Sequence, residues 1–159
     1  MAHRISVLSR SDSARAARIY AALAERYPKS GLTGVTVSVA YTVDAVLSVA
    51  SLKKAASVLA NPVIDQVSTA RVLGPASFSY AIEIGFRPGV TDNAGNTARQ
   101  MIEDATGRKL KGMQSVYSSY FVFFAGRVSR ADAERMAGER HNSLIERARV
   151  VAFKEWNNG

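Results

Sequence analysis

The sequence predicts an α+β fold made of two tandem βαββαβ units, and three observations predict it. A short pattern recurs along the chain, long segments alternate between apolar and polar residues, and helical segments carry one apolar stripe. The recurring pattern is Asn61-Pro62-Val63-Ile64-Asp65, which returns as Asn142-Ser143-Leu144-Ile145-Glu146. We therefore expect one unit over residues 1–75 and a second over 78–156, with residues 157–159 as the start of a linker or tail.

Two further landmarks support the duplication. Residues 51–59 parallel residues 129–137, and Leu32-Thr33-Gly34-Val35 parallels Leu110-Lys111-Gly112-Met113. Both landmarks recur after 78 positions (51 to 129, 32 to 110), whereas the asparagine pattern recurs after 81 (61 to 142). We therefore place a three-residue insertion in the connection between helix and strand, where insertions are cheapest.

The elements of the first unit follow from its periodicity. Ile5 and Val7 indicate a short strand, and Asp12 is the expected cap of a helix whose apolar stripe runs from Ala16 to Tyr27. Residues 35–47 alternate strictly, which only an extended chain can turn into one buried face. Because this run is longer than usual strands, we expect a break near Ala40. Ser51 then caps a second helix, Pro62 ends it, and residues 63–67 form the last strand.

The second unit repeats this order. Residues 80–86 form its first strand and residues 87–90 a turn, after which Thr91 or Asp92 caps a helix with a stripe over residues 94–105 and Gly107 as its C-cap. Residues 113–125 are expected to form two strands, with the break at residues 118–119. Ser129 and Asp132 form an approximate capping box for the next helix, and residues 144–153 supply the last strand.

Both faces of the strand at residues 120–124 carry large apolar side chains. Phe121 and Phe123 point to one side, and Tyr120, Val122 and Phe124 point to the other. One of these faces should therefore pack outside its own unit. The economical arrangement is that the two sheets pack against each other as an internal pseudo-dimer with antiparallel sheets. The pattern leaves open whether they meet face to face or edge to edge.

Composition bounds the class of protein. The 159 residues include 21 Lys+Arg against 13 Asp+Glu, for a net charge of +8, and no cysteine. The missing cysteine excludes disulfides, a thiolate nucleophile and zinc sites with sulfur ligands. The N-terminal residues lack a signal-peptide pattern, and no stretch approaches the length of a membrane span. We expect a cytoplasmic protein with no membrane partner.

Candidate chemistry is sparse. His3 and His141 have no carboxylate cluster at metal-ligand spacing, and no Gly-x-Ser-x-Gly elbow is present, so no catalytic, cofactor-binding or metal residue is predicted. Residues 85–93 join a strand to a helix N-terminus and could hold an anion. Asp92 argues against an anion because a carboxylate at the cap occupies the place of a phosphate. We interpret this segment as a structural turn or a partner-contact loop that includes Arg87, Gly89 and Asp92.

Two motifs together resemble a known family. Arg87-Pro88-Gly89-Val90-Thr91-Asp92 and Leu59-Ala60-Asn61-Pro62-Val63-Ile64-Asp65 resemble the PurS-type small subunit of phosphoribosylformylglycinamidine synthase. The tandem arrangement is similar to the N-terminal region of the long, single-chain enzyme, where two such units mimic the small-subunit dimer. The chain departs from the family at residues 9–12, which replace the Arg-Pro-Gly loop, and at Asn142-Ser143, which replaces Asn-Pro.

The resemblance implies a non-catalytic domain of purine biosynthesis, which belongs to an ATP-dependent amidoligase whose catalytic residues lie elsewhere. It implies ATP, Mg and glutamine for the full enzyme, but no cofactor in this chain. The implied partners are the synthetase and glutaminase regions of the enzyme, in cis or in trans, which the domain bridges. The resemblance leaves open whether the chain is an excised domain or a separate protein.

Two other functions stay open on the residues alone. The basic charge allows an RNA-binding protein with tandem βαββαβ units, although Ser118-Ser119 precede the aromatic strand where the RNA-recognition consensus needs a basic residue and glycine. The charge is also spread over both units, so nucleic acid is not the expected partner. The other alternative is a regulatory module that binds a small molecule between its halves, which an apolar cleft with convergent polar groups would favour.

Overall fold

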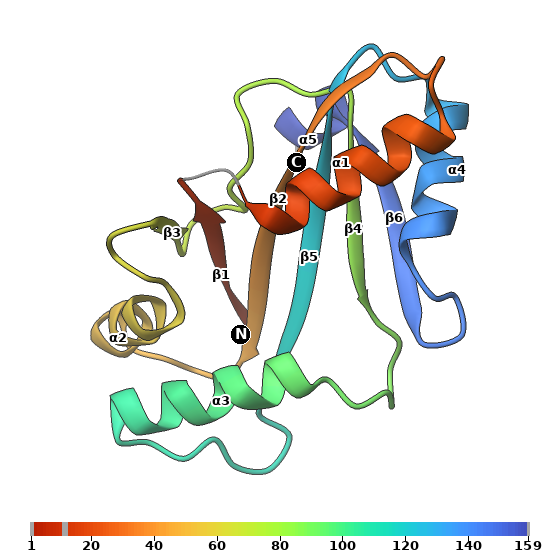
Figure 1. Cartoon of the computed structure of the whole chain (residues 1–159). Coiled ribbons are helices and arrows are strands. Elements are labelled where there is room, and N and C mark those ends of the chain that lie inside the picture. The colour runs from red at the N-terminus through yellow and green to blue at the C-terminus, as the bar shows by residue number, and fades with distance from the viewer. Residues whose placement is uncertain (1, 11–12, 159) are drawn as a thin grey trace. The chain divides into compact units, whose positions relative to one another are not determined.

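The computed structural model describes residues 2–10 and 13–158, which contain six strands and five helices (Figure 1). The strands are β1 (Ala2–Ser9), β2 (Leu32–Asp44), β3 (Asp65–Ser68), β4 (Tyr80–Phe86), β5 (Ser115–Gly126) and β6 (Glu146–Ala152). The helices are α1 (Ala14–Arg26), α2 (Val49–Leu59), α3 (Asn93–Thr106), α4 (Arg130–Arg140) and α5 (Phe153–Asn157). The fold is α+β, as the sequence predicts.

Hydrogen bonds join the strands into one six-stranded sheet in the order β3-β1-β2-β5-β4-β6. The pairs β1–β2, β1–β3 and β4–β6 are antiparallel. Because β2 belongs to the first sequence repeat and β5 to the second, the strands of the two repeats join edge to edge. None of the helices formed by residues 2–10 and 13–158 combines the length and the hydropathy that a membrane span needs.

The order of elements within each repeat differs from the prediction. Residues 32–44 form one unbroken strand, and so do residues 115–126, so the breaks expected near Ala40 and at residues 118–119 are wrong. Each repeat therefore has the order βαβαβ instead of βαββαβ. The strand stays unbroken because each half has its own core to pack against. Val37 packs in one hydrophobic cluster, and Val43 packs in the other.

Two compact units divide the described chain, and both are assembled from separated segments. One unit takes residues 2–10, 38–73 and 91–119, and we call it the first unit. The second unit takes residues 13–37, 74–90 and 120–158. These units differ from the repeats expected over residues 1–75 and 78–156. The helix α1 of the first repeat belongs to the second unit, and α3 of the second repeat belongs to the first unit.

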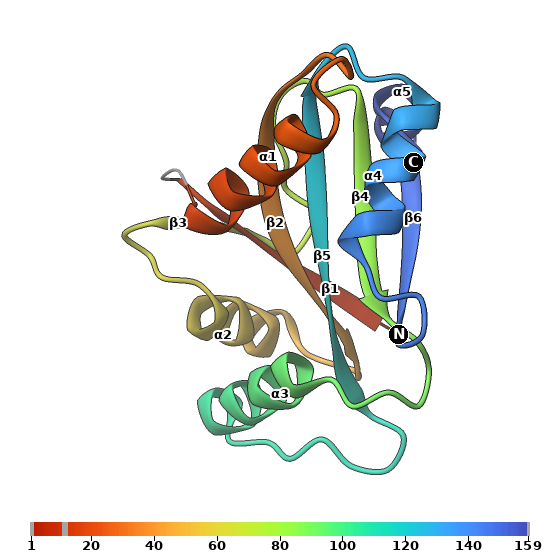
Figure 2. The same cartoon turned by 45° about the vertical axis from the view of Figure 1, so that its right-hand side comes forward.

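The second unit has a core between two helices and its strands. The helices α1 and α4 lie on the same face of β4 and β5 (Figure 2). The stripe of α1 buries Ala16, Ile19 and Leu23, as its spacing predicts, against Val122 and Phe124 of β5.

The opposite face of β5 is covered by aromatic side chains of the same unit. Phe121 and Phe123 meet Trp156 of α5 with ring centroids 5.6 and 5.3 Å apart, and Phe78 lies 5.0 Å from Phe123. The Phe121 and Phe123 face is thus covered within its own repeat. On the other face, Val122 and Phe124 pack against α1 of the first repeat, so the expectation that one face packs outside its own repeat is confirmed. The sequence patterns do not predict α5, because they place Phe153 in the last strand and residues 157–159 in a linker or tail.

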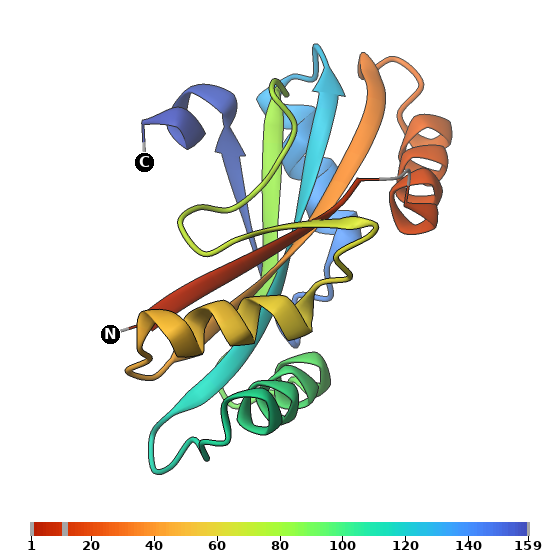
Figure 3. The ribbon, with the colours of Figure 1, turned by 90° about the vertical axis from the view of Figure 1, so that its left-hand side faces the viewer.

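The first unit has its own core. The helices α2 and α3 lie side by side (Figure 3) and bury Ala55, Ala56, Ala98 and Ile102. These side chains pack with Ile5, Val43 and Val116 of the strands.

Helix caps correct the alignment of the repeats. Asp12 lies outside the described residues, and Ser13 is the N-cap of α1. Ser48, instead of Ser51, caps α2, because its side chain accepts the Ser51 N–H. Ser129 caps α4 in the same way, through the Asp132 N–H. The predicted caps Asp92 and Gly107 of α3 are confirmed.

The matched caps give the spacing of equivalent elements. Ser48 and Ser129 are 81 positions apart, so α2 and α4 correspond at the same spacing as the asparagine pattern. Ser13 and Asp92 are 79 apart, and the buried residues Ala16 and Gly95 keep this spacing. The landmarks at 78 positions are therefore misaligned, and the extra residues of the second repeat lie before α3 and between α3 and α4.

Candidate functional site

The predicted contact loop follows β4 in the second unit. Arg87, Pro88 and Gly89 are exposed, and Gly89 has a φ of +84° with no atom near the place of a Cβ. The Arg87 backbone N–H donates to the Ile145 carbonyl at 2.8 Å, and its Nε donates to the Ser143 carbonyl at 2.8 Å. Arg87 therefore fastens this loop to residues 142–146.

Asp92 has a structural role within the first unit. One carboxylate oxygen accepts the Gly95 N–H and the Ser118 hydroxyl, each at 2.7 Å, and the other accepts the Ser118 N–H at 2.5 Å. Asp92 thus caps α3 and ties it to β5. The three predicted site residues fall into two units, with Arg87 and Gly89 in one and Asp92 in the other.

The recurring asparagine pattern forms the same turn twice, and we call residues 61–65 and 142–146 the Asn turns. In the second unit, the Asn142 side-chain oxygen accepts the Leu144 N–H at 3.1 Å, and Glu146 accepts the Asn142 N–H at 2.8 Å. The Asn142 carbonyl also accepts the N–H groups of Ile145 and Glu146 at 3.0 and 2.7 Å. Side chain and backbone together hold this turn in one conformation.

The first unit repeats each of these bonds. The Asn61 side-chain oxygen accepts the Val63 N–H at 3.0 Å, and Asp65 accepts the Asn61 N–H at 2.8 Å. The Asn61 carbonyl accepts the N–H groups of Ile64 and Asp65 at 3.2 and 2.8 Å. The two Asn turns are therefore equivalent in hydrogen bonding, although Pro62 is replaced by Ser143.

Each Asn turn exposes a pair of aliphatic side chains. The exposed fractions are 79% for Val63, 46% for Ile64, 84% for Leu144 and 40% for Ile145. A single exposed aliphatic residue is ordinary, but the same exposed pair at the same place in two otherwise different repeats calls for a reason. The sequence pattern does not reveal these residues as exposed, because it predicts Val63 and Leu144 as the first residues of strands, whereas β3 and β6 begin at Asp65 and Glu146.

An exposed arginine lies beside each aliphatic pair. The Arg10 N–H donates to the Ile64 carbonyl at 2.6 Å, as the Arg87 N–H does to the Ile145 carbonyl. Each Asn turn is thus an apolar tip with a cationic residue at its base. Rigid tips of this kind suit contact with a protein surface, because little conformational entropy is lost on binding.

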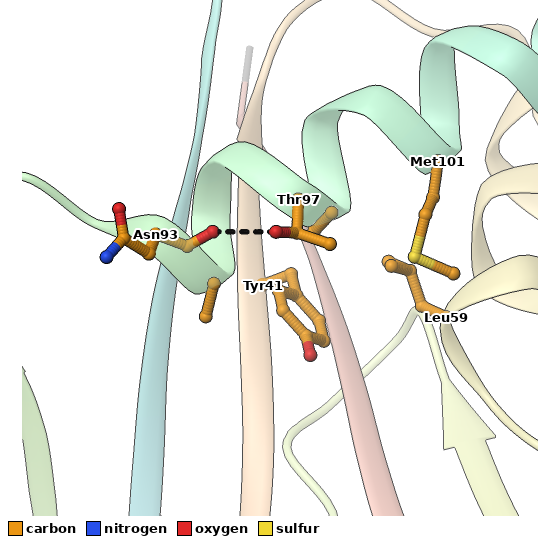
Figure 4. A pocket seen from close by; sticks show the side chains of 7 residues that line it. Tyr41, Leu59, Asn93, Thr97 and Met101 are labelled. Atoms are coloured by element: carbon orange, nitrogen blue, oxygen red, sulfur yellow. Dashed lines mark hydrogen bonds between the residues drawn. The ribbon is translucent and has the colours of Figure 1, made fainter.

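A pocket of about 330 Å³ lies in the first unit (Figure 4). Its lining residues come from β2, α2 and α3 and are Tyr41, Leu59, Asn93, Ala94, Thr97, Ala98 and Met101. Burial of the Tyr41 side chain raises the pKa of its phenol, and the negative charge of Asp92 adds to this effect. No pattern in the sequence marks these residues as a site.

The described part of the chain gathers no set of metal-ligating side chains. Among residues 2–10 and 13–158, no three His, Asp or Glu side chains lie close enough to hold a metal ion. The His141 Nδ1 donates to the Ala137 carbonyl at 2.5 Å, at the C-terminal end of α4.

A scan against models of protein families finds no match, and a search of curated proteins finds none either. The Asn turns, the Arg87 loop and the pocket are therefore the basis on which a function can be argued.

Proposed function

We propose that this chain is a non-catalytic, tandem PurS-like domain of phosphoribosylformylglycinamidine synthase, folded as an internal pseudo-dimer. It would bridge the synthetase and glutaminase regions of that enzyme in the cytoplasm, in cis or in trans. ATP, Mg and glutamine would be handled by those regions, and none of them by this chain.

The observation that carries the proposal is the repetition of the Asn turn. The turn is the structural form of the Leu-Ala-Asn-Pro-Val-Ile-Asp motif, and it recurs with the same hydrogen bonds 81 positions later. The interleaved units also support a pseudo-dimer, because each repeat gives one helix to the unit built around the other repeat's strands. A duplicated domain with two equivalent apolar tips is suited to hold two partners.

Binding to the catalytic regions tests the docking part of the proposal. The double variant Val63→Ser/Leu144→Ser removes both tips, and we expect it to weaken binding at least about tenfold, because a buried aliphatic contact contributes roughly 1–2 kcal/mol. Met113→Ser is the matched control, since Met113 is 93% exposed and lies outside both turns. Equal loss of binding in the control, or no loss in the double variant, would overturn the assignment of the tips.

The Arg87 loop has a separate test. Arg87→Ala removes the bond to the Ser143 carbonyl and the positive charge, so binding should weaken. Arg87→Lys keeps the charge without the guanidinium fork and separates the two contributions. If Arg87→Ala leaves assembly unchanged, the loop is not part of the docking surface.

A further inference from the structure

The pocket of the first unit lies where the second unit is filled. The spacings of 79 positions for α1 and α3 and of 81 positions for α2 and α4 identify the equivalent helix residues. Ala94 corresponds to Arg15 and Leu59 to Arg140. Tyr41, which lines the pocket beside Ala94 and Leu59, therefore takes the place of Tyr120, which lies beside Arg15 and Arg140. The comparison is internal to the chain, so each unit serves as a reference for the other.

In the second unit, these side chains occupy the space. The Arg15 guanidinium lies 4.1 Å from the centroid of the Tyr120 ring, and the Tyr120 hydroxyl donates to the Arg140 carbonyl at 3.2 Å. Burial raises the pKa of Tyr120, Glu146 adds to this effect, and the positive charges of Arg15 and Arg140 oppose it. An arginine stacked on a tyrosine closes this site without a ligand.

In the first unit, smaller residues leave the space open. Ala94 and Thr97 present short side chains on α3, and Leu59 replaces the long arginine at the end of α2. The α3 side of this hollow is exposed, so it opens to the surface. An open apolar hollow of about 330 Å³ at this one of two equivalent places favours an occupant. The volume lies at the lower end of the range of small-molecule sites.

The lining limits the chemistry of that occupant. No lysine or arginine lines the pocket, so an anion would be unpaired. Leu59 and Met101 form apolar walls, and a thioether packs well on aromatic rings. Figure 4 shows the Asn93 amide directed away from Tyr41, and the Thr97 hydroxyl donates to the Asn93 carbonyl at 3.0 Å. The Tyr41 hydroxyl is the remaining polar group of the lining.

We propose that the first unit binds a small, neutral aromatic molecule between α3, α2 and β2, with its ring against Leu59 and Met101 and one polar group at the Tyr41 hydroxyl. The second unit has no such site because Arg15, stacked on Tyr120, fills the equivalent space. This site is separate from the Asn turns and holds whether or not they dock on a catalytic region.

The test is a titration of the whole chain followed by amide proton–nitrogen spectra. The probes are benzamide, benzoate and benzylamine, which share a ring and differ in charge. We expect benzamide to shift the amide signals of residues 93–101 at millimolar concentration, and benzoate and benzylamine to shift them less. Residues of the second unit should not move with any probe.

A blocking variant shows whether the pocket is responsible. Ala94→Arg restores the side chain that the second unit carries, and because Ala94 is exposed the chain should fold. Gln100→Arg adds the same side chain to an exposed position of α3 outside the pocket and is the matched control. We expect the shifts to vanish in Ala94→Arg and to persist in Gln100→Arg. Absence of shifts in the unchanged chain, or shifts that survive Ala94→Arg, would overturn the proposal.

Discussion

Single residues decide how closely the backbone segments approach each other. Gly126 has a φ of +96°, and a Cβ there would lie 2.1 Å from the Gly31 carbonyl oxygen and 3.1 Å from the Thr33 nitrogen. Both obstacles are backbone atoms of the same unit, so neither can rotate away. Gly126 is therefore required for the approach of the two segments as well as for the turn after β5.

We predict that Gly126→Ala destabilises the fold by about 3 kcal/mol or more, because left-handed strain of about 1–2 kcal/mol adds to the clash. Gly89→Ala is the matched control, since Gly89 also has a positive φ but nothing within 4 Å of its Cβ. It should lose only the strain, about 1 kcal/mol. Urea denaturation compares the two, and equal losses would show that the approach to Gly31 does not matter.

At the scale of an element, the Glu103 side chain binds the segment that follows α3. Glu103 of α3 accepts the Leu110 N–H at 2.9 Å and pairs with Arg99 and Lys109, each at 3.2 Å. The Arg99 guanidinium also donates to the Leu110 carbonyl. These contacts hold the segment after Gly107 against the helix.

The same contacts make part of the stability depend on pH. The Leu110 N–H, followed by the hydrogen bonds of Lys109 and Arg99, lowers the pKa of the Glu103 carboxyl below its ordinary value of 4.5. Because the folded pKa is the lower one, this stabilisation is present above the ordinary value and is lost as the pH falls through the lowered value.

We therefore predict that Glu103→Gln is less stable than the unchanged chain at neutral pH, and that the gap narrows below about pH 4. Thermal unfolding of both chains at a series of pH values measures the difference in their stability. A gap that stays constant down to acid pH would show that the Glu103 charge contributes nothing.

The short helix α5 acts as a cover for β5. Trp156 is the only tryptophan of the chain, and its ring meets Phe78, Phe121 and Phe123 edge-on at 5.3–5.7 Å. We predict that Trp156→Ala costs about 3 kcal/mol, near the lower end for a truncated aromatic residue, and that Trp156→Phe costs less. Denaturation followed by circular dichroism checks both variants. An unchanged midpoint in Trp156→Ala would mean that α5 does not stabilise the sheet.

At the scale of the whole molecule, the sequence predicted the features that periodic and capping patterns mark. The α1 stripe, the bounds of β4 and the caps Asp92 and Gly107 follow from local patterns. The interleaving of the repeats does not, because alternation along residues 35–47 shows one buried face but not which helices cover it. Ser48 and Ser51 are equally good caps, so the wrong serine shifted the alignment by three positions. The pocket depends on Ala94 facing Tyr41 across elements, which no local pattern records.

The most direct measurement of the proposed function is glutamine-dependent formation of formylglycinamidine ribonucleotide by a synthetase and glutaminase that lack a small-subunit region. We predict no turnover by this chain alone, and a gain in glutamine-dependent turnover when the chain is added, with ammonia-dependent turnover little changed. The Val63→Ser/Leu144→Ser variant should give less of that gain than Met113→Ser. Turnover by the chain alone, or the same glutamine-dependent rate with and without it, would contradict the proposal.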